Sequence, residues 1–258
     1  MYEAELNLAR RALATYQRVY AETGSIAITR QKLPADFATE SDEAIEAAVT
    51  EVLRESGIPI QGEEASAHES SSTRWIIDPI DGTFNFAMGI PLHGFILCLV
   101  SEDQPVLGVM NAAGEILETV AGQGTTLDGT RVQTSSSDVA TGTVNVGDFT
   151  TASDSRYPND LRSRMLHVLG TNTSGRIRMV GSAAVDLAWV AAGRSVASII
   201  YSNHPWDTAA GVLAVRESGG VAYDLEGNSW SLGSTSTLTA ASDAVADQIF
   251  ALADLAFS

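Results

Sequence analysis

The sequence predicts a layered fold of mixed α-helices and β-strands. Strands come first in runs and later alternate with helices, which is the order expected for helices packed in layers against sheets. Of the 258 residues, 45% are apolar and 18% are charged, a composition typical of a globular protein with a large core. No linker-like stretch divides the chain, so we expect one unit made of two packed halves, residues 1–140 and residues 141–258.

The predicted helices follow from apolar residues at three- and four-residue steps. Leu6, Ala9 and Leu13 have this spacing in a first helix over residues 4–22. A second helix is predicted over residues 42–55, because glycine and proline follow it. Further helices are predicted over 160–169, 183–192, 207–218 and 243–256.

Short runs rich in β-branched residues predict the strands, and clusters of serine and threonine predict loops. The strands are expected at 74–78, 93–101, 105–112, 116–120, 142–147, 176–180, 196–201 and 236–240. Residues 65–73 and 150–159 are expected to form mobile loops.

The charge of the chain limits its partners. It has 15 basic and 32 acidic side chains, a formal charge of −17, which repels polyphosphates and anionic lipids. We therefore expect neither nucleic acid nor a membrane as the principal partner. The first residues lack the features of a signal peptide, and no apolar run could span a bilayer, so a cytoplasmic protein is expected. The single cysteine, Cys98, lies in an apolar run and is expected to be a small buried hydrophobe.

The most informative segment is the end of the strand that begins near residue 74. It carries Asp78 and Asp81, three residues apart and stiffened by Pro79, into a turn at Gly82. Carboxylates bind hard cations, and the backbone N–H groups of Gly82 and Thr83 can receive phosphate oxygens. These residue types therefore suit a metal-bridged phosphate. The structural alternative is an Asp-Pro turn followed by an Asx turn.

The segment Asp78-Pro79-Ile80-Asp81-Gly82-Thr83 resembles the signature of the inositol monophosphatase family, the Mg²⁺-dependent, lithium-sensitive phosphomonoesterases related to fructose-1,6-bisphosphatase. Further segments resemble that family's motifs in the same order along the chain: Asp36-Phe37-Ala38-Thr39-Glu40-Ser41-Asp42, Gly62-Glu63-Glu64, Gly181-Ser182-Ala183-Ala184, and Trp206-Asp207 with Gly211 and Glu217-Ser218-Gly219-Gly220. The resemblance covers roughly residues 30 to 240.

The resemblance implies an α+β fold with the layers αβαβα, the sugar-phosphatase fold. Residues 1–140 would form the metal-binding, catalytic half and residues 141–258 the substrate-side half. It also implies a homodimer that hydrolyses a small phosphorylated polyol or sugar, with inositol 1-phosphate as the first candidate. Fructose 1,6-bisphosphate, histidinol phosphate and 3′-phosphoadenosine 5′-phosphate are alternative substrates. The alternative of another class is a non-catalytic regulatory or binding protein that keeps the fold.

Two features bear on these alternatives. Thr83 is followed by Phe84-Asn85-Phe86, which is closer to the inositol-type sequence than to the histidinol-phosphate type. The carboxylates of the motifs and Thr83 are all present, whereas a non-catalytic relative would be free to lose them.

The resemblance also implies a role for each matching residue. Two or three Mg²⁺ ions per site would be held by Glu63, Asp78, Asp81, Asp207 and the carbonyl of Ile80. Thr83 and Asp42 would orient the attacking water, and Glu63 would contribute to catalysis through a third, looser ion. The substrate would contact Asp81, Gly82, Thr83, Gly181, Ser182, Ala183, Ile200 and Asp207.

Several of these residues also have structural interpretations. Thr39 and Asp42 could form a capping box, and both roles can hold together. Asp207 could be a helix N-cap. Glu63 and its neighbour could be solvated loop charges, and His93, on an apolar strand, is expected to be a packed core histidine. Lys32, the one lysine in the chain, would lie near the phosphate or on the surface.

Five carboxylates converging on one cleft, however, would repel one another strongly without cations between them. The set is Asp42, Glu63, Asp78, Asp81 and Asp207.

The sequence departs from the family at one substrate position. Inositol-type enzymes usually have a glutamate seven residues before the aspartate of the Trp-Asp pair, and this chain has Ile200 there. Isoleucine accepts no hydrogen bond, so a ring hydroxyl facing it would lose about 1–3 kcal/mol. Asn203 or His204 could supply the polar contact instead. We therefore expect a weak or broadened preference for inositol 1-phosphate.

Overall fold

The structure is a computed structural model that describes residues 2–23, 28–33, 36–64, 71–150, 152, 155–173 and 176–257. Of residues 28–33, 36 and 37 it describes the backbone alone, so the predicted position of the Lys32 side chain lies outside the described part. Residues 65–70 of the first predicted loop and residues 151, 153 and 154 of the second also lie outside it.

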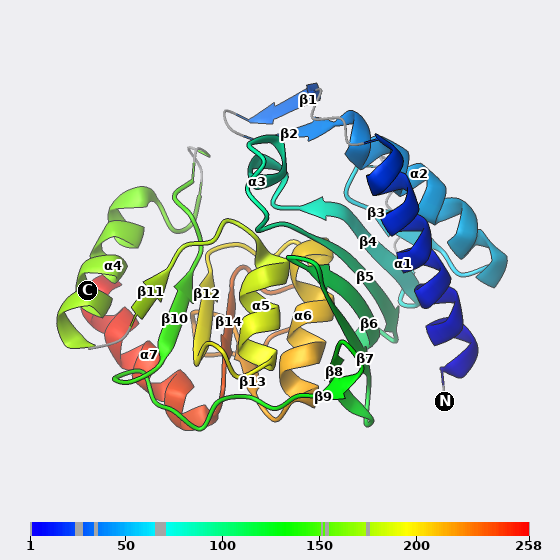
Figure 1. The fold of residues 1–258 in the computed structure, drawn as a ribbon. Coiled ribbons are helices and arrows are strands. Elements are labelled where there is room, and N and C mark those ends of the chain that lie inside the picture. Colours follow the sequence, from blue (N-terminus) through cyan, green and yellow to red (C-terminus); the bar gives the residue numbers. More distant parts are fainter. Residues whose placement is uncertain are drawn as a thin grey trace.

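The chain folds into five layers, in the order αβαβα (Figure 1). One helix pair covers the outer face of a seven-stranded sheet, a second pair lies between the two sheets, and a third covers the outer face of a five-stranded sheet. In that order the pairs are α1 (Glu3–Thr23) with α2 (Glu40–Leu53), α5 (Ala183–Ala191) with α6 (Pro205–Glu217), and α4 (Asn159–Asn172) with α7 (Asp243–Phe257). The predicted layered α+β class is confirmed.

The larger sheet has the order β3-β4-β5-β6-β7-β8-β9 and is antiparallel except for the parallel pair β3–β4. Its strands are β3 (Ile60–Gly62), β4 (Arg74–Asp81), β5 (Gly94–Ser101), β6 (Gln104–Ala112), β7 (Glu115–Val120), β8 (Gly124–Leu127) and β9 (Thr130–Arg131). This meander places the carboxyl end of β4 beside the start of β5, with Asp78 opposite Ile96 and Asp81 opposite Gly94.

The smaller sheet has the order β11-β10-β12-β14-β13, in which β11, β10 and β12 are parallel and the other pairs antiparallel. Its strands are β10 (Thr143–Val146), β11 (Arg176–Arg178), β12 (Ala197–Ile200), β13 (Val221–Tyr223) and β14 (Thr237–Ala240). The sheets therefore fall on either side of residue 140 in the sequence. The predicted division of a single unit into residues 1–140 and 141–258 stays a prediction.

All six predicted helices and all eight predicted strands are present, with ends that shift by a few residues. The described elements that were not predicted are all short. These are the hairpin β1 (Ile28–Leu33) and β2 (Asp36–Thr39), the 3₁₀ turn η1 (Arg54–Ser56), the helix α3 (Thr83–Ala87), and strands β3, β8, β9 and β13. None of the described helices combines the length and apolar character needed to cross a membrane.

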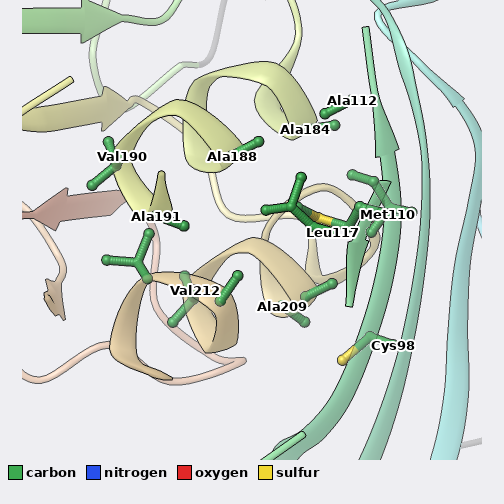
Figure 2. Close-up of a cluster of buried hydrophobic side chains, with 14 of the residues drawn as sticks. Cys98, Met110, Ala112, Leu117, Ala184, Ala188, Val190, Ala191, Ala209 and Val212 are labelled. Atoms are coloured by element: carbon green, nitrogen blue, oxygen red, sulfur yellow. The ribbon is translucent and has the colours of Figure 1, made fainter. Parts of the chain in front are cut away.

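Small side chains let the central helices pack closely on the larger sheet (Figure 2). A Cβ atom on Gly94 would lie 2.8 Å from the Cβ of Ala184, and one on Gly108 would lie 3.1 Å from the Cβ of Ala210. Cys98 is fully buried in this cluster, as predicted, and burial raises the pKa of its thiol. The close packing brings the first turns of α5 and α6 to the carboxyl end of β4.

Candidate metal centre

Strand β4 positions two carboxylates at its carboxyl end. Asp78 is 2% exposed and Asp81 7% exposed, and the backbone N–H of Ile80 donates a hydrogen bond of 3.0 Å to Oδ1 of Asp78. The pairing with β5 is irregular between these two residues. Gly82 ends the strand with a φ of 79°, and a Cβ atom there would lie 2.9 Å from the carbonyl oxygen of Gly181. Glycine therefore permits the sharp exit that leads into α3.

Asp207 reaches the same place from α6. The N-cap of this helix is His204 and Pro205 opens its first turn, so the interpretation of Asp207 as the N-cap is wrong. Its carboxylate lies in the first turn instead. One carboxylate oxygen from each of Asp78, Asp81 and Asp207 lies within 4.8 Å of the others.

Glu63 lies near Asp78 in the segment after β3, and it is not one of the three residues whose carboxylate oxygens lie within 4.8 Å of one another. Its side chain is half-buried and hydrogen-bonds with that of Asp78. Glu46, a buried residue of α2, holds the segment in place, because its Oε2 accepts a 2.9 Å hydrogen bond from the backbone N–H of Glu64. A Cβ atom on Gly62 would lie 2.4 Å from the Glu46 carboxylate, which explains the glycine of the Gly-Glu-Glu segment.

The electrostatics of the group indicate a cation site. Burial raises the pKa of Asp78 well above its ordinary range, and the charges of Glu63, Asp81 and Asp207 raise it further. Burial also raises the pKa of Asp81 to about 6, although its hydrogen bonds oppose the shift. Carboxylate oxygens are the ligands that Mg²⁺ and Ca²⁺ prefer. The residues present therefore fit a divalent cation, which would relieve the repulsion between them.

The N-terminus of α5 holds Asp81 in place. Ser182 donates a hydrogen bond from Oγ to Oδ2 of Asp81, and the backbone N–H groups of Ala183 and Ala184 donate at 3.1 and 2.9 Å. The same Ser182 Oγ accepts a hydrogen bond from the N–H of Val185 and is the N-cap of α5. Ser182 was expected to line the substrate, and its contact with Asp81 was not anticipated. No local sequence pattern indicates this contact, because the two residues are 101 positions apart in the chain.

Thr83 and Asp42 lie together beside the carboxylates. The hydroxyl of Thr83 is 2.9 Å from the carbonyl oxygen of Ile80 and 3.4 Å from Oδ1 of Asp42. Asp42 also forms the predicted capping box with Thr39 at the start of α2. Burial raises the pKa of Asp42 to about 6 against these hydrogen bonds. The capping interpretation is thus confirmed, and Oδ1 of Asp42 still faces Thr83.

Asn203 and His204, the two polar residues considered as replacements for the missing glutamate, differ in their contacts. Ile200 is 8% exposed at the end of β12. The Asn203 amide donates to the carbonyls of Ser231, Leu232 and Ser234, and its Oδ1 accepts from Thr208, Trp230 and Thr237. Asn203 therefore anchors the 231–234 loop. His204 is exposed and stacks on Trp206 with ring centroids 5.2 Å apart.

His93 is half-buried just before β5 and packs against aromatic side chains, in line with the packing role predicted for it. Its ring contacts those of Tyr20 and Phe86, which also contact each other; Nε2 is 3.3 Å from the Tyr20 hydroxyl, and burial lowers the pKa of His93.

The comparisons with known proteins agree with this geometry. A model of the inositol monophosphatase family matches residues 1–255. Inositol-1-monophosphatase ImpA of Mycolicibacterium smegmatis is 39% identical over 211 residues, which cover 80% of this chain and 76% of that protein. Nus factor SuhB of Escherichia coli is 32% identical over 233 residues, covering 86% and 85% respectively. The solved structure of the Thermotoga maritima IMPase superposes with a TM-score of 0.85 at 26% identity, covering 99% of this chain and 97% of that one. The chain therefore belongs to the inositol monophosphatase family and is a phosphoric monoester hydrolase of a metal-dependent kind.

Proposed function

We propose that the protein hydrolyses a small phosphate monoester in a Mg²⁺-dependent reaction, and that inositol 1-phosphate is its first candidate substrate. The observation that carries the proposal is the convergence of Asp78, Asp81 and Asp207 within 4.8 Å, with the Thr83–Asp42 pair beside them. The names of two relatives support the substrate, since ImpA and the Thermotoga protein are both called inositol monophosphatases.

In this proposal two or three Mg²⁺ ions would be held by Glu63, Asp78, Asp81, Asp207 and the carbonyl of Ile80. When bound, Mg²⁺ neutralises the phosphate charge and lowers the pKa of a coordinated water. The carboxylates supply the charge that holds the cations, and the backbone amides of α5 keep Asp81 aimed at them. Because the chain has a net charge of −17, cations held by these carboxylates would favour the binding of a phosphate ester.

Thr83 and Asp42 orient the attacking water. The Thr83 hydroxyl lies between the Ile80 carbonyl and Asp42, so it can accept a hydrogen bond from a water while it donates to one of these oxygens. The pKa of about 6 at Asp42 suits a carboxylate that receives a proton near neutral pH. Gly181, Ser182, Ala183 and Ile200 would line the pocket for the alcohol.

A phosphate-release panel tests the proposal. Inositol 1-phosphate, fructose 1,6-bisphosphate, histidinol phosphate and 3′-phosphoadenosine 5′-phosphate are each incubated with the protein, in Mg²⁺ and in EDTA. We expect release only in Mg²⁺, greatest with inositol 1-phosphate and inhibited by lithium. Release from none of the four esters in Mg²⁺ would contradict the proposal and favour a regulatory protein that keeps the fold. The homodimer also remains a prediction, which analytical ultracentrifugation checks.

A further inference from the structure

The three parallel strands of the smaller sheet end at one edge. Ligands of open α/β sheets bind in the crevice outside the carboxyl ends of such strands. The segments that follow β10, β11 and β12 are residues 147–150, 179–182 and 201–204. Asp148 is the single acidic residue in these three segments.

Asp148 lies next to the predicted substrate turn. A Cβ atom on Gly181 would be 3.1 Å from Oδ2 of Asp148, and the following residue, Ser182, donates to Asp81. The pKa of Asp186, a buried residue of α5, is raised mainly by burial and further by the charges of both Asp81 and Asp148. The carboxylate of Asp148 is therefore on the side of α5 where Asp81 receives its hydrogen bonds.

The same segment adjoins the position where the family glutamate is missing. The backbone N–H of Gly147 donates a 2.8 Å hydrogen bond to the carbonyl of Ile199, and a Cβ atom on Gly147 would be 3.7 Å from the Cα of Ile200. Asp148 therefore follows directly after a residue, Gly147, that packs against Ile200.

The carboxylate of Asp148 is available for a ligand. The residue is exposed, and Nη1 of Arg162 donates to its backbone carbonyl. Within the described part of the chain, no donor hydrogen-bonds to its carboxylate oxygens and no salt bridge includes them. Burial raises the pKa of this carboxyl, and the nearby charge of Arg162 opposes that shift. Asn203, by contrast, already uses both ends of its amide within the fold.

We propose that Asp148 is a specificity-determining residue of the alcohol pocket. Its carboxylate accepts hydrogen bonds from hydroxyl groups of the phosphorylated polyol, which Ile200 cannot do. This inference rests on the proposed phosphatase function. It makes the substrate class a phosphate ester whose alcohol carries hydroxyl groups beyond the ester oxygen.

The test compares two esters that share the phosphate and differ in the alcohol. Inositol 1-phosphate has ring hydroxyls, and phenyl phosphate has none. The ratio of their kcat/KM values is measured in Mg²⁺ for the wild type, Asp148→Ala, Asp148→Asn and Asp247→Ala. Asp247 is exposed on α7, away from the site, so its substitution removes the same charge as a control.

Because Asp148→Ala removes a charged hydrogen-bond acceptor, we expect it to lower this ratio by about tenfold or more, mainly by raising KM for inositol 1-phosphate. Asp148→Asn keeps an acceptor oxygen and should lower it less, and Asp247→Ala should not change it. An Asp148→Ala ratio equal to that of Asp247→Ala, in an enzyme that hydrolyses both esters, would overturn the inference and leave the proposed function standing. A wild type that hydrolyses neither ester would overturn both.

Discussion

Replacing Ser182 by alanine tests how the fold holds the Asp81 carboxylate. The Ser182 hydroxyl donates to Asp81 and also accepts from the N–H of Val185 as the N-cap of α5. Loss of an N-cap costs about 1 kcal/mol. Loss of a buried hydrogen bond to an ionised carboxylate costs about 1.5–3 kcal/mol. We therefore expect Ser182→Ala to lower the free energy of unfolding by about 2.5–4 kcal/mol near pH 8.

The cost should depend on pH with a definite sign. The Ser182 hydrogen bond favours ionised Asp81, whose pKa in the folded protein is raised to about 6. Below that pH the carboxyl is protonated, and only the cap and an uncharged hydrogen bond are lost. The destabilisation should therefore grow as the pH rises through 6, by about 1–2 kcal/mol.

Urea unfolding in EDTA near pH 5 and pH 8 measures this difference. Ser242→Ala is the matched control, because the Ser242 hydroxyl accepts from the N–H of Val245 at the start of α7 in the same way, at the same 3.3 Å. We expect its cost to be about 1 kcal/mol and independent of pH. Equal costs for the two variants at both pH values would refute the reasoning about Asp81.

Four further predictions follow from the site. Asp78→Asn should reduce kcat by at least about 1000-fold with circular dichroism unchanged, because it removes metal-binding charge while Oδ1 can still accept from Ile80; near-normal turnover would contradict the metal assignment. Thr83→Ala should lower kcat by about 100-fold or more and change KM little, and the opposite pattern would show a binding role. Metal-free protein should lose stability as the pH rises from 4 to 6, because the pKa values of Asp42 and Asp81 are raised to about 6 in the folded state. Mg²⁺ should therefore raise the Tm more at pH 8 than at pH 5.5. Ile200→Glu should raise the kcat/KM ratio of inositol 1-phosphate to glycerol 2-phosphate by about tenfold. A strong wild-type preference for inositol 1-phosphate that the substitution leaves unchanged or reduces would contradict the role given to position 200.

The long elements and the metal-binding carboxylates were predictable because their signals are local. Amphipathic spacing predicts α1, and one short segment contains both Asp78 and Asp81. Helix α3 was not predicted, because five residues are too few to show a helical period and Gly82 before it is typical of a turn.

Two supporting contacts could not be predicted because they join distant parts of the chain. Ser182 and Asp81 are separated by 101 positions, and Glu46 reaches the segment of Glu63 from a helix whose acidic residues are mostly typical of a solvated surface. In both cases tertiary packing decides what a common polar residue does. The sequence motif predicted a substrate contact at Ser182, and no local pattern gave Glu46 a role.

The position of Asp207 has a consequence for the stability of the whole molecule. Asp78 belongs to the larger sheet and Asp207 to the helix layer between the sheets, so a cation held by both is a cross-link between segments far apart in the sequence. Links that close long loops restrict the unfolded chain the most. A bound divalent ion would therefore link these segments and stabilise the folded protein against unfolding.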